Sequence, residues 1–242
     1  MPELPEVEIM VRQLRPHLRG RTIRRVEVCD PKIKVRDTLT GYRIMAIRRR
    51  AKFIIFDLSN DRHLLVHLRM TGWFEFVRPM KYRFAIHAGK AVAYFADSRR
   101  FGVVELLKPI ELVERLARLG PEPFVSDLAA LKRTTRPVKV ALLDQALVAG
   151  IGNIYACESL WRARINPRRR ADRLTVVERR RLQRCIVAAL RKGIKYGPRI
   201  FAVQEFYVYD RAGRVCRRCG TLIRRIVQAQ RSTWFCPHCQ RR

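Results

Sequence analysis

Acidic residues are scarce in this 242-residue chain. Only 21 Asp and Glu stand against 52 Lys and Arg, which gives a formal net charge of +31 and a pI near 11.3. Lysine is scarce as well, because arginine supplies 42 of these cations and lysine only 10. A charge this large indicates a polyanionic partner and makes nucleic acid the leading candidate. Composition alone leaves DNA and ribosomal RNA open.

The sequence also lacks long hydrophobic runs. No apolar stretch approaches the roughly 20 residues that a membrane helix needs, and no secretory hydrophobic region follows Met1. We therefore expect no membrane partner and a cytoplasmic location, associated with the nucleoid if the partner is DNA. A disulfide framework is disfavoured too, because the cysteines number seven and three of them, Cys29, Cys157 and Cys185, are scattered.

The other four cysteines form two Cys-x-x-Cys pairs near the end of the chain. Sixteen residues separate the pairs, which is the spacing of a closed tetrahedral zinc site. His238 lies inside the second pair but is not needed, since four thiolates complete the coordination. We predict one structural Zn²⁺ held by Cys216, Cys219, Cys236 and Cys239.

Hydrophobic periodicity predicts three parts in an α+β multidomain chain. A leading helix carries Val7, Val11, Leu14 and Leu18 on one face, and short alternating segments follow it. We expect an N-terminal β-sandwich domain over residues 1–108 and a helical domain over 109–205, with a tight turn at Gly150-Ile151-Gly152-Asn153. A zinc finger built on a β-hairpin over residues 224–235 is expected within 206–242.

The start of the chain, Met1-Pro2-Glu3-Leu4-Pro5-Glu6, carries reactive groups. Removal of Met1 would give Pro2 a free secondary amine, which is a nucleophile toward an aldehyde-like carbon. The positive end of the following helix disfavours protonation of that amine. Glu3 and Glu6 are two carboxylates that can move protons. The alternative is an ordinary helix start, where Pro and Glu are common.

Pro2-Glu3-Leu4-Pro5-Glu6-Val7-Glu8 resembles the start of the formamidopyrimidine-DNA glycosylase family, bifunctional base-excision enzymes related to the endonuclease VIII group. Further matches lie along the whole chain in the family's order. They are Arg50-Ala51-Lys52-Phe53, His67-Leu68-Arg69-Met70-Thr71-Gly72, Asp97-Ser98-Arg99-Arg100-Phe101-Gly102, Lys139 to Gln145 with Gly150 to Tyr155, and the cysteine-bearing end.

The resemblance implies a function and a set of site residues, with residues 1–108 as the catalytic domain and residues 109–205 as a helix–two-turn–helix DNA-binding domain. Pro2 would form a Schiff base with C1′ of an oxidised nucleotide in duplex DNA, and β,δ-elimination would then cleave the strand. Glu3, Glu6 and Lys52 would assist. Met70, Arg99 and Phe101 would fill the space left by the extruded nucleotide. Phosphate contacts are implied for His67, Arg100, Lys139, Asn153, Tyr209, Arg225 and Arg231. The family implies a monomer with no organic cofactor.

Two segments depart from the family pattern. Lys81-Tyr82-Arg83-Phe84 stands where relatives often carry Lys-His-x-His, so one imidazole contact is not expected here. The segment 193–209 is shorter than the loop that covers an extruded 8-oxoguanine, which moves the expected preference toward ring-opened purines or oxidised pyrimidines. A second class of function stays open at this point: a non-catalytic zinc-ribbon nucleic-acid binder or a degenerate glycosylase.

Overall fold

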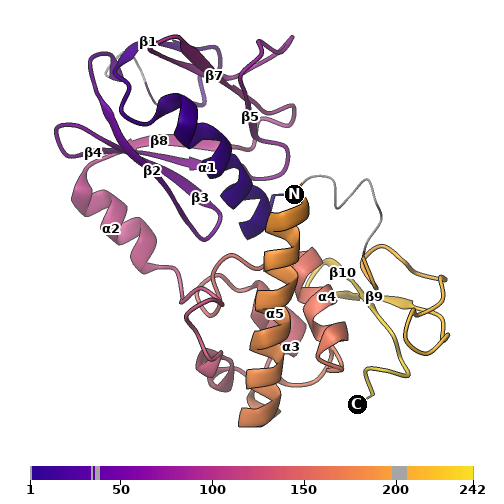
Figure 1. Ribbon diagram of the computed structural model, residues 1–242. Coiled ribbons are helices and arrows are strands. Elements are labelled where there is room, and N and C mark those ends of the chain that lie inside the picture. Colours follow the sequence, from indigo (N-terminus) through magenta and orange to yellow (C-terminus); the bar gives the residue numbers. More distant parts are fainter. Residues whose placement is uncertain (1, 34, 36–38, 198–205, 242) are drawn as a thin grey trace. The chain divides into compact units, whose positions relative to one another are not determined.

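The computed structural model describes residues 2–33, 35, 39–197 and 206–241. The chain divides into two compact units, Met1–Ala117 and Arg118–Arg242 (Figure 1). The finer division at residue 205 stays a prediction, and that residue lies outside the described ranges. In the part of the chain that is described, no helix combines the length and the apolarity needed to cross a membrane.

The first unit opens with α1 (Leu4–Leu18), which the sequence predicts. Pro5 lies in its first turn, where a missing N–H costs nothing. Val7, Val11, Leu14 and Leu18 are fully buried, which confirms the apolar face. A reciprocal capping box between Glu3 and Glu6 begins the helix, so the start of the chain is fixed to a rigid element.

Two four-stranded antiparallel sheets follow α1 and form the expected sandwich (Figure 1). One has the order β1 (Ile23–Val28), β6 (Phe84–Ala88), β7 (Ala91–Ala96), β5 (Trp73–Glu75). The other has the order β2 (Ile44–Arg50), β3 (Phe53–Leu58), β4 (Arg62–His67), β8 (Val103–Leu107). Phe56 of one sheet packs on Phe74 of the other, and one core joins both sheets to α1. The unit ends with α2 (Pro109–Ala117).

The second unit is helical and then turns into a hairpin. Its helices are η2 (Ala129–Arg133), α3 (Val138–Leu143), α4 (Asn153–Arg162), η3 (Ala171–Arg173) and α5 (Val176–Tyr196). Strands β9 (Arg224–Gln228) and β10 (Arg231–Phe235) pair antiparallel, as the alternation over 224–235 predicts. The α+β class with a leading helix, a helical region and a C-terminal hairpin is therefore confirmed.

Candidate active site and nucleic-acid interface

The start of α1 places Pro2 beside two buried carboxylates. Pro2 is half-buried, whereas Glu3 is 1% and Glu6 4% exposed. Glu6 Oε2 accepts a hydrogen bond from the backbone N–H of Glu3 at 2.7 Å. The Glu6 carboxylate thus has a structural partner within the helix cap.

Lys52 lies in the tight turn between β2 and β3. Ala51 takes a left-handed φ of 51°, which turns the chain sharply and presents the next residue. Lys52 is buried, with 8% of its surface exposed. This burial is notable because a lysine ammonium is more strongly hydrated than an arginine guanidinium. Arg49 connects this turn to α1, because its Nε donates to Glu8 at 3.1 Å and its Nη1 to Ala51 O at 3.2 Å.

His67 ends β4 opposite Phe53, and the two rings meet edge to face at 4.9 Å. Burial lowers the pKa of His67 to about 3, and the charges of Arg69 and Lys52 act in the same direction. The imidazole is therefore neutral near pH 7. Its Nδ1 lies 3.0 Å from the backbone N–H of Arg69 and accepts that proton, so Nε2 carries the imidazole hydrogen.

The expected wedge residues lie in two loops, 68–72 between β4 and β5 and 97–102 between β7 and β8, which we call the wedge loops. Phe101 is 51% exposed, and the Arg99 guanidinium lies 4.9 Å from the centre of its ring. Met70 is half-buried. A place in the hydrophobic core, which is the usual position of such side chains, is thereby excluded for Phe101. The loops are connected, since the backbone N–H of Arg99 donates to Thr71 Oγ1 at 3.2 Å.

Arg100 is tied to an acid that sequence reasoning missed. Its Nε and Nη2 donate to the two carboxylate oxygens of Asp30 at 3.0 and 2.7 Å. The Arg100 side chain is still 52% exposed, so its outer face stays open to solvent. Asp30 is 70 residues away in the sequence, and no local pattern connects the two.

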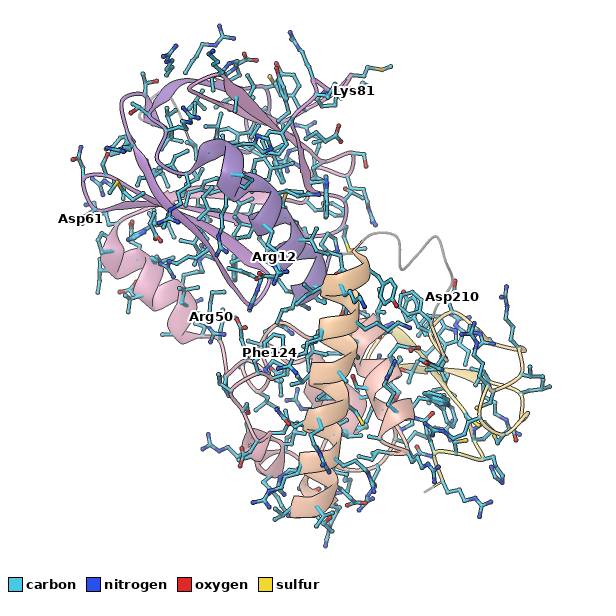
Figure 2. All side chains as sticks on the ribbon, in the orientation of Figure 1. Arg12, Arg50, Asp61, Lys81, Phe124 and Asp210 are labelled. Atoms are coloured by element: carbon cyan, nitrogen blue, oxygen red, sulfur yellow. The ribbon has the colours of Figure 1, made fainter. Side chains whose placement is uncertain are left out.

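Residues 81–84, which depart from the family pattern, include both exposed and buried side chains. Lys81 is exposed on the loop before β6 (Figure 2). Tyr82 Oη donates to Glu27, which raises the pKa of Tyr82 to about 12 and lowers that of Glu27 to about 2. Arg83 is buried, with 4% of its surface exposed.

In the second unit, Gln145 shapes the turn between α3 and α4. Its Nε2 donates to Leu143 O and Ile151 O, and its Oε1 accepts the N–H of Gly150, each at 2.9 Å. Gly150 has a φ of 95°, which suits glycine. Gly152 is the N-cap of α4, so the backbone donors of the first helical turn begin at Asn153. Lys139 lies in α3 and is fully buried.

The hairpin brings three of the sequence-predicted residues together around Ser232. Asn153 Nδ2 donates to Ser232 O and Arg225 Nε to Ser232 Oγ, both at 2.9 Å. Arg231, the neighbour of Ser232, starts β10 and is exposed. Ser232 itself carries no chemical signal that sequence reasoning could use.

Tyr209 lies nearby in the same unit. Its ring centre is 4.6 Å from that of Trp234 in β10. Its backbone N–H donates at 3.0 Å to Oε1 of Glu158, a buried residue of α4 that the sequence did not single out.

The four predicted zinc ligands converge. Their sulfur atoms all lie within 4.8 Å of one another, with Cys219 Sγ 3.5 Å from Cys236 Sγ and Cys216 Sγ 3.9 Å from Cys239 Sγ. Tetrahedral coordination at about 2.3 Å requires separations of this size. Trp161 Nε1 donates a hydrogen bond to Cys216 Sγ at 3.4 Å, which helps to orient this ligand. The arrangement fits one structural zinc ion.

Three family models match the chain in succession. The formamidopyrimidine-DNA glycosylase N-terminal domain matches residues 1–104, the H2TH domain of the same family matches 119–205, and the zinc finger found in FPG and IleRS matches 213–242.

Curated relatives and solved structures agree with these models. Formamidopyrimidine-DNA glycosylases from Chloroflexus aurantiacus and Thermus thermophilus are 39% and 40% identical, in each case over 99% of this chain and 98% of theirs. The crystal structure of the MutM (Fpg) protein from Thermus thermophilus superposes with a TM-score of 0.90 at 39% identity, covering 99% of this chain and 98% of that one. Lactococcus lactis Fpg in complex with abasic-site DNA superposes with a TM-score of 0.91 at 32% identity, and each chain is fully covered. The chain belongs to the formamidopyrimidine-DNA glycosylase family.

Proposed function

We propose that this protein is a bifunctional DNA glycosylase and AP lyase that removes oxidised bases from duplex DNA in base-excision repair. The observation that carries the proposal is the half-buried Pro2 held beside two buried carboxylates at the start of α1, in a chain of this family. The Lactococcus lactis relative has been solved with abasic-site DNA and with Fapy-dG DNA, which supports damaged duplex as the partner.

The chemistry begins at the amine of Pro2 once Met1 has been removed. Its lone pair forms a bond to C1′ of the damaged nucleotide, the glycosidic bond breaks with its electrons leaving on the base, and the base takes a proton from water. The nitrogen passes its own proton to Glu3, which delivers it to the ring oxygen, so that the sugar ring opens and the nitrogen becomes an iminium. That cation acidifies the 2′ proton, so loss of this proton expels the 3′ phosphate, and a second elimination expels the 5′ phosphate. Water then hydrolyses the remaining imine and frees Pro2. The iminium is the electron sink, so the chain's own residues supply the chemistry.

Lys52 and His67 complete the catalytic side of the first unit. We assign Lys52 a contact to the damaged nucleotide, because a nearly buried ammonium on a rigid turn suits a fixed anionic group. His67 contacts a phosphate as a neutral Nε2–H donor rather than as a cation. Glu6 holds the helix start in place.

Extrusion of the nucleotide leaves a hole that must be filled, since unstacking costs a few kcal/mol. We assign this role to Met70, Arg99 and Phe101, because the exposed Arg99 and Phe101 pack on each other and the half-buried Met70 lies in the neighbouring loop. Arg99 can also hydrogen-bond the orphaned base.

The remaining cations and amides hold the DNA backbone. Asn153 and the exposed Arg231 flank Ser232, and backbone donors at the start of α4 suit a phosphate. The proposed phosphate ligands besides His67 are Arg100, Lys139, Asn153, Tyr209, Arg225 and Arg231. The zinc ion would brace the hairpin that presents the finger residues. We further propose that the protein acts as a monomer, in the cytoplasm, on nucleoid DNA.

A non-catalytic DNA binder would also need zinc and salt-sensitive affinity, so borohydride trapping is the discriminating experiment. The mature enzyme should become covalently bound to an abasic duplex, whereas Pro2→Gly and a form that retains Met1 should not. The absence of an adduct with the mature protein would overturn the proposal.

Lesion preference requires a panel of duplexes that each carry one damaged base. We expect ring-opened purines or oxidised pyrimidines to be excised faster than 8-oxoguanine. The expectation rests on the short segment 193–209, part of which, 198–205, lies outside the described residues.

A further inference from the structure

Two buried aspartates, the buried Arg83 and the half-exposed Arg100 form a charged cluster that connects to the loops carrying the wedge residues. Arg83 is its centre. Its backbone is fixed between β1 and β7, since its N–H donates to Phe95 O and its C=O accepts from Cys29 N, both at 2.9 Å. The side chain therefore extends from a rigid sheet and is 5% exposed.

The Arg83 guanidinium makes three hydrogen bonds to groups far apart in the sequence. Nε donates to Asp30 Oδ2 at 2.5 Å, and Nη1 donates to Asp97 Oδ2 at 2.8 Å and to Gly102 O at 2.7 Å. Asp30 in turn binds Arg100 through both carboxylate oxygens. The charges of Arg83 and Arg100 balance those of the two buried aspartates, as burial of carboxylates requires.

Asp97 connects Arg83 to both wedge loops through hydrogen bonds. Its Oδ2 also accepts the N–H of Gly102 at 2.7 Å, which closes the loop around Arg99 and Phe101. Its Oδ1 accepts the Thr71 hydroxyl, beside Met70. Hydrogen bonds from Thr71, Gly102 and Arg83 together outweigh burial, which acts to raise the pKa of Asp97, and the pKa lies below its ordinary value. Asp97 is thus charged near pH 7.

Gly102 shows how closely these groups pack. A Cβ atom there would come within 2.6 Å of the Phe95 ring and 3.0 Å of Asp97 Oδ2. The loop end is therefore pressed against both the sheet and the carboxylate. A shift of Asp97 would move the loop that bears Arg99 and Phe101.

We propose that Arg83 is the positioning residue for the void-filling loops, fixing Met70, Arg99 and Phe101 through Asp97 so that the wedge is formed before DNA binds. The inference rests on the proposed function of these three residues. Lysine cannot replace Arg83, because a single ammonium cannot hold Asp30, Asp97 and the Gly102 carbonyl in the flat geometry of a guanidinium.

The test compares duplex with single-stranded substrate in Arg83→Lys. Single-stranded abasic DNA leaves no hole to fill, so β-elimination on it needs Pro2 but not the wedge. We expect excision from a lesion-bearing duplex to fall about 10- to 100-fold, the effect of a displacement near 1 Å, while cleavage of the single strand is unchanged. A 2-aminopurine placed opposite an abasic analogue should show a weaker change in emission on binding.

Thr71→Val supplies a second variant that changes only an exposed residue of the loop. It removes the hydroxyl that links Asp97 to the Arg99 backbone and should reproduce the selective duplex loss to a smaller degree. Arg48→Lys is the control for the loss of a two-pronged arginine–carboxylate contact. Arg48 in β2 donates to Asp57 in β3 through two nitrogens, and neither residue belongs to the wedge loops. It should leave the ratio of duplex to single-strand activity unchanged.

The outcomes separate this inference from the proposed function. If the wild-type enzyme forms no borohydride adduct, the function itself fails. If wild-type trapping succeeds but Arg83→Lys and Thr71→Val keep the full duplex rate, or lose duplex and single-strand activity equally, positioning by Arg83 is overturned.

Discussion

Glu6 Oε2 accepts the backbone N–H of Glu3 at 2.7 Å, and the Glu3 side chain in return accepts the backbone N–H of Glu6, so both acids belong to the cap of α1. Glu can be replaced by Gln in such a cap because the amide oxygen also accepts. Glu3 is the neighbour of Pro2, the proposed nucleophile, whereas Glu6 lies four residues from Pro2 in the sequence. We therefore expect Glu3 to be the proton carrier and Glu6 to support the helix start.

Glu3→Gln and Glu6→Gln should differ sharply in rate. We expect Glu3→Gln to lower single-turnover excision by about 10²- to 10⁴-fold, the usual contribution of general acid–base catalysis. Glu6→Gln keeps the cap and should stay close to wild type in both rate and melting temperature. Glu6→Ala serves as the control for the cap, and it should cost about 1 kcal/mol of stability. Equal losses in the two glutamine variants would contradict the assignment.

His67 should titrate far below the physiological range. Its pKa is about 3 when folded against an ordinary value of 6.5, so the unfolded chain binds a proton between these values and the folded chain does not. The stability that this shift contributes is complete above pH 6.5 and declines as the pH falls toward 3.

Two measurements check this expectation. Proton NMR of the imidazole, assigned by comparison with His67→Gln, should give a midpoint near pH 3, and that variant should show a flatter decline of melting temperature below pH 6.5. A His67 midpoint between pH 6 and 7 would contradict the expectation and would leave the imidazole partly protonated near pH 7.

Elements with local signals were predictable from the sequence. The period of Val7, Val11 and Leu14 is a property of α1 itself, and the alternation over 53–58 coincides with β3. The cysteine spacing predicted the sulfur cluster because a metal site with paired ligands is encoded in two short segments. In each case the deciding atoms are close in the sequence.

The cluster around Arg83 had no such signal. Arg83 binds Asp30 from 53 residues away, and the pairing exists only after the sandwich has formed. Phe101 illustrates the same limit, since a large apolar residue is core by default and only the tertiary fold leaves it 51% exposed. The family resemblance pointed to the loop that carries Phe101, but no pattern in the sequence pointed to the groups that hold this loop.

Glu158 should control the position of Tyr209. Its carboxylate accepts the backbone N–H groups of Tyr207, Val208 and Tyr209 at 2.8 to 3.0 Å, and burial raises its pKa. Glu158→Ala would leave these donors without their acceptor, at about 1–3 kcal/mol for each buried group. We expect a loss of about 3 kcal/mol or more in urea unfolding and weaker binding of an abasic-analogue duplex.

Glu178→Ala is the matched control for that experiment. It removes the capping box of α5 and its ion pair with Arg169, but it does not touch residues 207–209. We expect a cost of about 1 kcal/mol and unchanged DNA affinity. If Glu158→Ala bound DNA as tightly as Glu178→Ala, Tyr209 would not depend on the carboxylate.

Substitutions in the turn between β9 and β10 should stabilise the protein. Ala229 and Gln230 both take left-handed φ angles, 45° and 58°, in a two-residue turn that favours Asn-Gly. The double change Ala229→Asn, Gln230→Gly should raise the unfolding free energy of the zinc-loaded protein by about 1 kcal/mol, because it relieves this strain. Gly220→Ala is the opposite test. Gly220 has a φ of 74°, and no atom lies within 4 Å of the place where a Cβ would be added, so the substitution strains only the backbone. It should lower stability by about 1–2 kcal/mol. DNA affinity should be retained in the double variant, because Arg231 starts β10 and its backbone stays paired with Gln228. A lower urea midpoint for the double variant would show that the turn is not a strained one.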